Sequence, residues 1–310
     1  MTSQIPEQLP EQYYDQQDGT NVCFLCGEPR YEKLYTIQHY GFPFTFYRCQ
    51  CDLIKQAPMP NEAFFEWFFN QDLFFSSKQT NTNHIWGYYD YFSDEPNRMA
   101  TSEWRYKRMR HVFEARKPLD IMKIGPATGT FLFVAKEHGH HVLGCDISSQ
   151  FREYARTKYH VEIDHGRFEK QPYEDGQFDV VLLLNVIENV PNQDEFLNAI
   201  VRTLKPGGHF IFNYVEMKNN LIEILQKEKY FIYRPPVCYA YTRDTIQKIL
   251  DKYGFVMTEK FNDRRILNVE KVFSLLGWYG FVNLARKLKL NRVSFPIYAY
   301  PSKIVIARKL

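Results

Sequence analysis

The chain has 310 residues, with 39 lysines and arginines against 36 aspartates and glutamates, and its net charge is +3. A balance this close to neutrality gives no general attraction to nucleic acid, so we expect no nucleic-acid partner. No apolar run is long enough to span a bilayer and the N-terminus lacks a secretory signal pattern, which together predict a cytoplasmic protein without a transmembrane segment.

The N-terminal region divides into a polar tail and a cysteine-rich segment. Residues 1–20 are rich in Gln, Glu, Pro and Asp, and we expect them to be disordered. Residues 21–60 then contain four of the six cysteines: Cys23, Cys26, Cys49 and Cys51. Two pairs of thiolates joined by a hairpin are typical of a structural zinc site, so this segment is predicted to be a zinc-binding lobe. The second pair is unusually tight, which leaves open that one of Cys49 and Cys51 is a bystander and that His39 takes its place.

The segment 61–117 is predicted to be a helical linker or cap. Its large apolar residues between Phe64 and Phe75, seven aromatics and Leu73, are too numerous for one face of a surface helix. We expect them to pack between the lobe and the main domain. The basic residues from Arg105 to Arg110 either meet acidic substrate groups or form a solvated helix face.

The stretch 119–146 has the pattern of a strand, a glycine turn, a helix and a second strand that ends in an acid. Glycines at such a turn let the backbone approach a ligand, and Asp146 at the end of the second strand can hold ribose hydroxyls. The same βαβ unit serves dinucleotides and S-adenosylmethionine. The spacing from Gly125 through Ala127 to Gly129 lacks the third glycine of a dinucleotide fingerprint.

This turn resembles motif I of the class I S-adenosylmethionine-dependent methyltransferases, with Ala127 where a glycine is commonest. The segment 204–208, Leu-Lys-Pro-Gly-Gly before an apolar strand, resembles another signature of the same superfamily. From Cys23 onward the chain resembles a subgroup that carries an N-terminal four-cysteine lobe. The resemblance implies an α/β, Rossmann-like sheet that is mostly parallel with an antiparallel last strand, preceded by the small zinc-binding lobe.

The resemblance also implies two cofactors, S-adenosylmethionine and structural Zn²⁺. In the family, the residue after the strand-end acid packs on adenine, and the loop before the fourth strand touches the adenine ring. The implied cofactor-binding residues are Gly125, Ala127, Gly129, Asp146, Ile147, Phe168, Glu169 and Asn185. The implied metal ligands are Cys23, Cys26, Cys49 and Cys51.

Two positions depart from the family pattern. Lys123 stands where the family has an acid that helps to seat the methionine amino group, so the cofactor either binds through neighbours such as Asp120 or binds weakly. Asn189 stands where a histidine is frequent, which removes one candidate base. The sequence identifies no catalytic base among the residues that remain: Glu188, Tyr214, Glu216, His84 and Tyr239.

The methyltransferase domain is predicted to span 118–310, with cap insertions at 215–241 and 262–298. We expect aromatic residues of the first insertion to cover the acceptor pocket, because ligands in open α/β sheets sit beyond the carboxyl ends of the strands. The second insertion is interpreted as a lid or a contact with a second copy of the chain. The alternative is an amphipathic helix that rests on a membrane surface.

The function predicted from these features is methyl transfer from S-adenosylmethionine to oxygen or carbon of a small molecule, sugar or glycan precursor. One alternative is a zinc-lobed binding or scaffold protein that keeps the fold without the chemistry, motivated by Lys123 and Asn189. A less favoured alternative is a nucleic-acid methyltransferase that uses its basic helix to bind phosphates.

Overall fold

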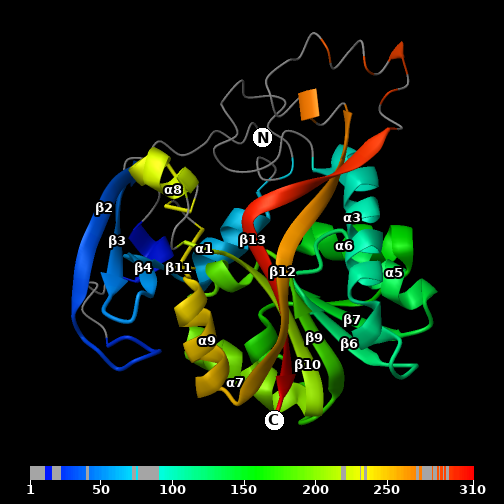
Figure 1. Ribbon diagram of the computed structural model, residues 1–310, viewed down its shortest axis with the longest axis horizontal. Helices are drawn as coiled ribbons and strands as arrows, with labels where there is room; N and C mark the ends of the chain where they lie inside the picture. Colours follow the sequence, from blue (N-terminus) through cyan, green and yellow to red (C-terminus); the bar gives the residue numbers. More distant parts are fainter. Residues whose placement is uncertain are drawn as a thin grey trace.

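The centre of the molecule is a seven-stranded sheet with the order β12-β13-β10-β9-β6-β7-β8 (Figure 1). β13 runs antiparallel to β10 and β12, and the other neighbouring pairs are parallel. This confirms the predicted fold class. The computed structural model describes residues 11–15, 22–39, 42–71, 75, 91–217, 221–230, 232–233, 236–269, 272–273, 281, 285, 287–288, 290 and 293–310.

The strands of the central sheet are β6 (Asp120–Ile124), β7 (His141–Asp146), β8 (Ile163–His165), β9 (Phe178–Leu183), β10 (Leu204–Val215), β12 (Phe255–Asn268) and β13 (Ser294–Lys309). The described helices are α1 (Glu62–Phe69), α3 (Glu95–Arg108), α4 (Arg110–Phe113), α5 (Thr130–Glu137), α6 (Ser149–Tyr159), α7 (Gln193–Thr203), α8 (Leu221–Gln226) and α9 (Arg243–Lys252). None of these helices is long and apolar enough to cross a membrane.

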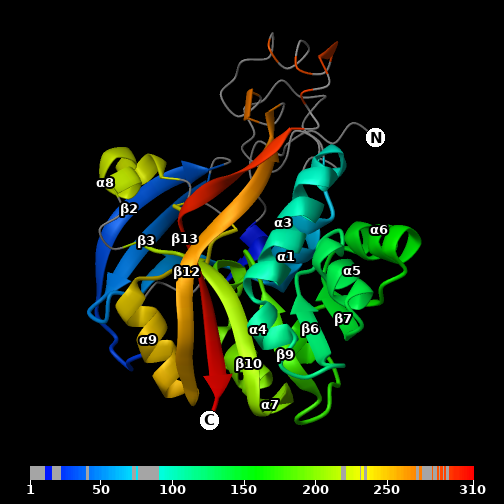
Figure 2. The same cartoon turned by 45° about the vertical axis from the view of Figure 1, so that its right-hand side comes forward.

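Both faces of the sheet are covered, as the apolar run from Val180 to Leu183 in β9 predicts. One face packs on α3, α4 and α5 through a cluster that includes Ile121 and Val180. The other face packs on α7, α9 and the N-terminal lobe through a cluster that includes Met122 and Val181. Because neighbouring strand residues alternate between the two clusters, the sheet forms the middle layer of the domain. Figures 1 and 2 both place the lobe on the side of α9, away from α5 and α6.

The N-terminal lobe is built on a four-stranded sheet with the order β11-β4-β3-β2. Three of its strands come from the predicted lobe: β2 (Tyr31–His39), β3 (Phe42–Cys49) and β4 (Ile54–Ala57). The fourth, β11 (Tyr239–Ala240), comes from the segment 215–241 and pairs antiparallel with β4. The lobe is therefore joined to the main domain by a shared sheet as well as by the chain.

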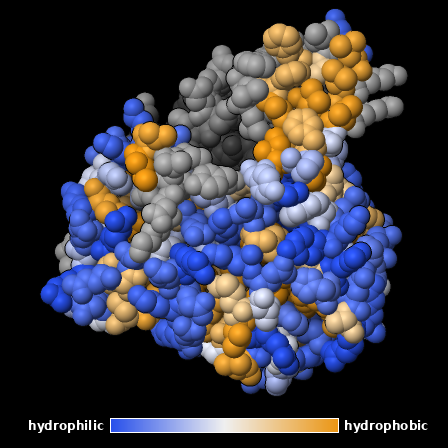
Figure 3. Space-filling model, viewed as in Figure 1, coloured by the Kyte–Doolittle hydropathy of each residue, from blue (hydrophilic) through white to orange (hydrophobic). Residues whose placement is uncertain are grey.

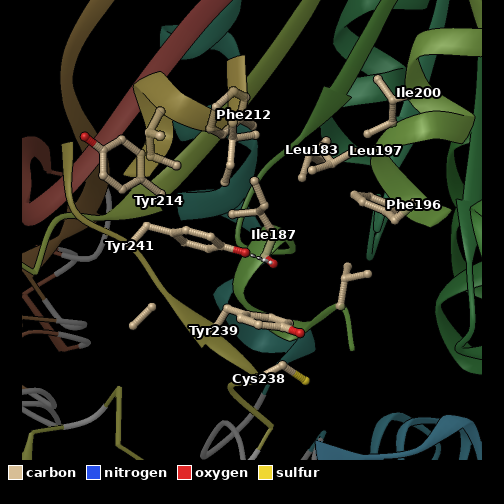
Figure 4. Packing of buried hydrophobic residues seen from close by; sticks show 14 of the residues in the cluster. Leu183, Ile187, Phe196, Leu197, Ile200, Phe212, Tyr214, Cys238, Tyr239 and Tyr241 are labelled. Carbon is tan, nitrogen blue, oxygen red and sulfur yellow. Dashed lines mark hydrogen bonds between the residues drawn. The ribbon is translucent and has the colours of Figure 1, made fainter. Parts of the chain in front are cut away.

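The described tyrosines of the segment 215–241 are buried against the lobe and the sheet. The ring of Tyr233 lies 5.0 Å from that of Tyr35 and 5.1 Å from that of Phe46. Figure 4 shows Tyr239 and Tyr241 beside Ile187, to whose carbonyl the Tyr241 hydroxyl donates at 3.2 Å. For these tyrosines the predicted role as a cover over an acceptor pocket is wrong, because pairing of β11 with β4 turns them into the interface between the two sheets.

The predicted disordered tail at 1–20 is wrong for residues 11–15, the part of it that the structure describes. Residues Glu11–Tyr13 form a short 3₁₀ helix, and β1 (Tyr14–Asp15) pairs with β5 (Met59–Pro60). Tyr14 packs on Phe44 and Phe64, with ring centroids 5.1 and 5.4 Å apart. Two aromatic side chains are enough to dock this polar stretch because the lobe provides an aromatic surface for them.

The segment 262–298 also differs from its prediction as an insertion. β12 continues to Asn268 and β13 begins at Ser294, so both strands run past the predicted limits. Between them the structure describes residues 269, 272–273, 281, 285, 287–288, 290 and 293. The segment is therefore, at both ends, an extension of the central sheet.

Candidate cofactor site and cysteine cluster

The turn between β6 and α5 has a left-handed backbone at three positions. The φ angles are +60° at Gly125, +51° at Ala127 and +79° at Gly129. A Cβ atom on Gly125 would lie 2.6 Å from the Val186 side chain, and one on Gly129 would lie 2.8 Å from the Cβ of Ala155. Both glycines are therefore required by sterics as well as by conformation: Gly125 lets the turn lie close to the loop after β9, and Gly129 lets it lie close to α6.

Asp146 ends β7 next to this turn and is 9% exposed. Its Oδ2 accepts the Ala127 N–H at 3.1 Å, and its Oδ1 accepts the Ser148 N–H at 2.9 Å. Burial raises the pKa of the carboxyl, and these two hydrogen bonds oppose the rise. Each oxygen keeps a lone pair beyond the one used here, so the carboxylate fits a ligand that donates hydroxyl hydrogens.

Lys123 lies within β6, two residues before Gly125, and is 5% exposed. Its Nζ donates to the Gly125 carbonyl at 3.3 Å. Burial lowers the pKa of the amine to about 7, with the Arg105 charge acting in the same direction and Asp146 opposing it. The amine is therefore close to half-neutral at neutral pH, which weakens the repulsion that a cationic lysine would exert on a sulfonium ligand.

Asp120 cannot replace the missing acid. It begins β6 and lies at the opposite edge of the sheet, where its carboxylate accepts hydrogen bonds from Lys205 at 2.7 Å and pairs with His141 at 3.0 Å. The suggestion that Asp120 seats the cofactor is wrong, because parallel strands bring their carboxyl ends, and not their amino ends, to the ligand edge.

The predicted adenine-side residues lie in different environments. Ile147 is half-buried directly after Asp146, and the Glu169 carboxylate accepts a hydrogen bond from Arg167 at 2.7 Å. Phe168 is only 2% exposed and its ring packs on those of Tyr173 and Phe196. Ile147 is therefore partly accessible directly after the strand-end acid, while Phe168 belongs to the core.

Asn185 follows β9 at the same edge and is exposed, with φ +59°. Its N–H donates to the Asn213 side chain at 2.5 Å, and its own side-chain oxygen accepts from Asn213 at 2.9 Å. Asn213 also donates to the Ser302 hydroxyl at 3.1 Å. This network ties the ends of β9, β10 and β13 together and fixes Asn185 at the edge of the sheet.

Two residues at this edge are missed by the sequence analysis. Asn70, the C-cap of α1, donates to the Ile147 carbonyl at 3.2 Å and accepts from the Ser149 N–H at 3.0 Å. Thr128 has a buried hydroxyl without a hydrogen-bond partner in the described part of the chain. Thr128 lies inside motif I, where the sequence could have indicated it. Buried hydroxyls in proteins normally have a hydrogen-bond partner, so this one is a candidate contact for a ligand. Nothing in the sequence near Asn70 indicates its role.

The candidate bases fall into structural roles. Glu188 is buried, and its Oε1 accepts the Val215 N–H at 2.8 Å; burial raises the pKa of its carboxyl to about 7. The Tyr214 hydroxyl donates to Glu216 at 3.3 Å. Tyr239 donates to the Pro191 carbonyl at 3.3 Å, and His84 lies outside the described residues. These contacts rank none of them as a base.

The four lobe cysteines come together as predicted. Their sulfur atoms all lie within 4.8 Å of one another, with Cys23 3.8 Å from Cys51 and Cys26 3.4 Å from Cys49. A tetrahedral site with Zn–S bonds of about 2.3 Å has sulfur atoms roughly 3.8 Å apart, so the cluster fits zinc. His39 is excluded as a substitute, because the β2–β3 register places Tyr31, eight residues earlier, opposite Cys49.

Comparison with known proteins gives the same assignment for the central part of the chain. Residues 122–212 match the family described as "Methyltransferase domain". A probable S-adenosylmethionine-dependent methyltransferase of Mycolicibacterium smegmatis is 30% identical over 107 residues, which cover 34% of this chain and 40% of that protein. Demethylmenaquinone methyltransferase of Staphylococcus saprophyticus is 26% identical over 209 residues, which cover 65% of this chain and 86% of that protein.

A solved structure resembles a larger part of the fold. Magnesium protoporphyrin IX methyltransferase from Synechocystis PCC 6803, with bound SAH, covers 80% of this chain and 99% of its own, with a TM-score of 0.51 at 14% identity. At that identity the likeness shows the fold. The sheet order and this likeness show the fold of the class I methyltransferases, and the family match identifies residues 122–212 as similar to a methyltransferase domain.

Proposed function

We propose that this chain transfers a methyl group from S-adenosylmethionine to oxygen or carbon of a small molecule, sugar or glycan precursor. The observation that carries the proposal is the contact between the left-handed turn and the strand-end acid, in which Ala127 N–H donates to Asp146 at 3.1 Å. This contact fixes an acceptor carboxylate beside a backbone that a ligand can approach. The named relatives, which include a demethylmenaquinone methyltransferase, favour a small-molecule acceptor.

The cofactor supplies a sulfonium methyl group; the acceptor–carbon bond forms as the carbon–sulfur bond breaks, and the acceptor's proton passes to solvent or a base. The residues of this chain bind and orient. The Asp146 oxygens would accept hydrogen bonds from the ribose hydroxyls, Ile147 would pack against the adenine, and the turn at 125–129 would accommodate the methionine portion. Glu169 and Asn185 are assigned to the same binding site as part of this proposal, and Phe168 lies in the core. Such positioning can contribute roughly 7 to 11 kcal/mol to a two-reactant step.

The test is calorimetric titration of S-adenosylmethionine into the purified chain and into Asp146→Asn. We expect at least a hundredfold loss of affinity in the variant, because the charge is removed and one of the two acceptor oxygens becomes an NH2 donor. Asp120→Asn is the matched control, since it removes an acid from the other edge of the sheet. If the folded parent does not bind S-adenosylmethionine, the scaffold alternative replaces methyl transfer.

We also propose that Cys23, Cys26, Cys49 and Cys51 bind one structural zinc ion. The lobe core is small, and a metal would add the stability that so few strands lack. Elemental analysis should give one zinc per chain, which Cys23→Ser loses and Cys145→Ser retains, because Cys145 is a buried cysteine outside the cluster. Zinc retained by Cys23→Ser would contradict the assignment.

A further inference from the structure

β12 and β13 extend beyond the rest of the central sheet. β10 pairs with β13 as far as Val215 opposite Ser302, whereas β12 and β13 remain paired from Arg264 opposite Tyr298 to Asn268 opposite Ser294. We call residues 264–269 and 293–298 the arm. Figure 2 shows it projecting past the ends of the neighbouring strands.

The arm leaves the sheet at the carboxyl ends of the parallel strands, where the cofactor is proposed to bind. We call this side of the sheet the cofactor edge. β12 and β10 are both antiparallel to β13 and therefore parallel to each other, and β10 is parallel to β9 and, through it, to β6 and β7. The carboxyl end of β12, where the arm lies, thus points the same way as the strand ends that carry Gly125, Asp146 and Asn185. A surface bound by the arm would face the site where the proposed acceptor enters.

Apolar side chains are exposed on and next to the arm. Val293 is 52% exposed, Phe295 37% and Tyr298 56%, and Phe281, Leu288 and Leu290 in the same part of the chain are exposed as well. These are six of the eleven large apolar side chains that are exposed among the described residues. Figure 3 shows hydrophobic residues gathered over this end of the molecule. Such a concentration marks an interaction surface.

The same segment is strongly basic. Residues 264–303 contain eight lysines and arginines and one acid, Glu270, in a chain whose net charge is +3. Arg265 is exposed on the arm, and the Arg264 guanidinium lies 4.3 Å from the centre of the Tyr298 ring. The neighbouring acid, Asp263, is buried and paired with Arg105 at 2.5 Å, so its charge is already balanced. The arm therefore complements an anionic, partly apolar surface.

The outer edge of the arm is not available for pairing with another strand. The Asn268 N–H donates to the Asn97 side chain at 2.8 Å, and the Ile266 N–H donates to the Thr101 hydroxyl at 2.9 Å, both from α3. Because α3 satisfies these donors, the β12 edge of the arm does not present the open edge that strand addition requires. A partner on this side of the arm is contacted through side chains.

We propose that the arm docks on an anionic lipid membrane. Its valine, phenylalanine and tyrosine side chains enter the boundary between headgroups and acyl chains, and its two arginines, Arg264 and Arg265, meet the lipid phosphates. An acceptor held in that membrane would lie next to the cofactor edge. This last consequence rests on the proposed methyl transfer, whereas the docking itself does not.

The test is co-sedimentation of the full chain with vesicles of phosphatidylcholine alone and of equal parts phosphatidylcholine and phosphatidylglycerol. We expect binding to the anionic vesicles that weakens as salt is raised, because salt screens the charge attraction. Val293→Ser and Phe295→Ser should each weaken binding about fivefold or more, by removing an apolar group that enters the lipid. Arg265→Gln should weaken it about fivefold, the effect of one basic residue near a charged surface.

Matched controls lie elsewhere on the same chain. Val256→Ser changes a 47% exposed valine at the start of β12, far along the strand from the arm, and Arg152→Gln changes an exposed arginine on α6. Both should bind vesicles like the parent. Circular dichroism melting confirms that each variant is folded; Val293→Ser preserves the test if Phe295→Ser unfolds.

Equal binding to both vesicle types, or parent-like binding by Val293→Ser, would overturn the proposal. Absence of vesicle binding together with a concentration-dependent dimer that Phe295→Ser abolishes would assign the arm to a second copy of the chain instead. The assay needs neither S-adenosylmethionine nor turnover, so its failure is separate from failure of the proposed methyl transfer.

Discussion

The two edges of the central sheet carry the same kinds of charged residues in opposite electrostatic situations. At the amino edge, Lys205 donates to Asp120 at 2.7 Å and to Asp179 at 2.9 Å. At the carboxyl edge, Lys123 and Asp146 are buried and make hydrogen bonds to backbone atoms of the motif I turn and the loop after β7. The ion pairs at the amino edge stabilise the fold. At the carboxyl edge, burial of ionisable groups costs folding free energy, and such a cost is typical of a ligand-binding site.

The largest effect should come from breaking the amino edge with Asp179→Ala. The Asp179 carboxylate accepts from Lys205, from Arg116 and from the Asp120 N–H, the last at 2.9 Å. Removing it leaves these donors without their acceptor and should lower the free energy of unfolding by about 2–4 kcal/mol. Chemical denaturation measures the loss, and affinity for S-adenosylmethionine should stay unchanged.

The control for this variant is Asp175→Ala, which removes a side chain that is 81% exposed and paired with Arg202. Exposed pairs contribute little, so its effect should stay within about 0.5 kcal/mol. A loss of cofactor affinity in Asp179→Ala at temperatures where it is folded would contradict the separation between the two edges.

Glu188→Gln tests the cost of a buried acid at the carboxyl edge. The folded-state pKa of about 7 lies above the unfolded value, so the group stabilises the fold at low pH and loses that contribution as pH rises through about 7. The variant keeps an oxygen to accept the Val215 N–H but cannot ionise. We expect it to raise the free energy of unfolding by roughly 2–3 kcal/mol at about pH 8 and to have little effect near pH 4.

Melting temperatures across this pH range measure the difference. Glu162→Gln, a change to an exposed glutamate on the same domain, should show no comparable pH dependence. A variant that is less stable than the parent at pH 8 would mean that the charged form of Glu188 is favoured in the folded protein, contrary to its burial.

The sequence predicts those parts of the site whose residues lie close together in the chain. Gly125, Gly129 and Asp146 belong to one βαβ unit, whose local spacing fixes the turn and the strand-end acid together. The contacts of the lobe with the main domain could not be predicted in the same way. β11 pairs with β4 across about 180 residues of chain, and no local pattern encodes that register.

Burial accounts for the other differences between the sequence-based predictions and the structure. Lys123 reads as a cation from sequence alone, but its surroundings lower its pKa to about 7. Phe168 reads as a ligand-contacting aromatic, whereas tertiary packing places it against Tyr173 and Phe196. In both cases the residue type is visible in the sequence and its solvation is not.

Lys123→Met tests the effect of a buried amine on cofactor binding, because it removes the cation from the cofactor edge. Lys123 is protonated below pH 7 and neutral above it, so its repulsion of a sulfonium is strongest at about pH 6 and weakest at about pH 8. The charged groups that influence it are Arg105 and Asp146. We expect parent affinity for S-adenosylmethionine to rise more steeply over this range than that of the variant, which should bind about three- to tenfold more tightly at pH 6.

Calorimetry at the two pH values provides the measurement. Lys136→Met is the matched control, because Lys136 also donates to a backbone carbonyl, that of His160 at 2.6 Å, but lies on the exposed side of α5. Identical pH profiles for the parent and Lys123→Met would show that Lys123 does not influence the bound sulfonium.

The smallest effect should come from Asn70→Ala, which uncouples α1 from the loop after Asp146. Its side chain holds the loop after Asp146 through the Ile147 carbonyl and the Ser149 N–H. Losing these bonds frees the residue that is proposed to pack on adenine, and should weaken S-adenosylmethionine binding about fivefold, the equivalent of about 1 kcal/mol. Asn198→Ala, on an exposed position of α7, is the control.

A positioning role for Asn70 is separated from a merely structural one by a conservative variant. Asn70→Asp keeps an acceptor for the Ser149 N–H but loses the donor to the Ile147 carbonyl, so it should recover part of the affinity that Asn70→Ala loses. If both variants melt earlier than the parent yet bind S-adenosylmethionine equally well, Asn70 stabilises the interface without positioning the loop. Partial recovery would show instead that α1, through its C-cap side chain, sets the geometry of a site to which it contributes no proposed ligand contact.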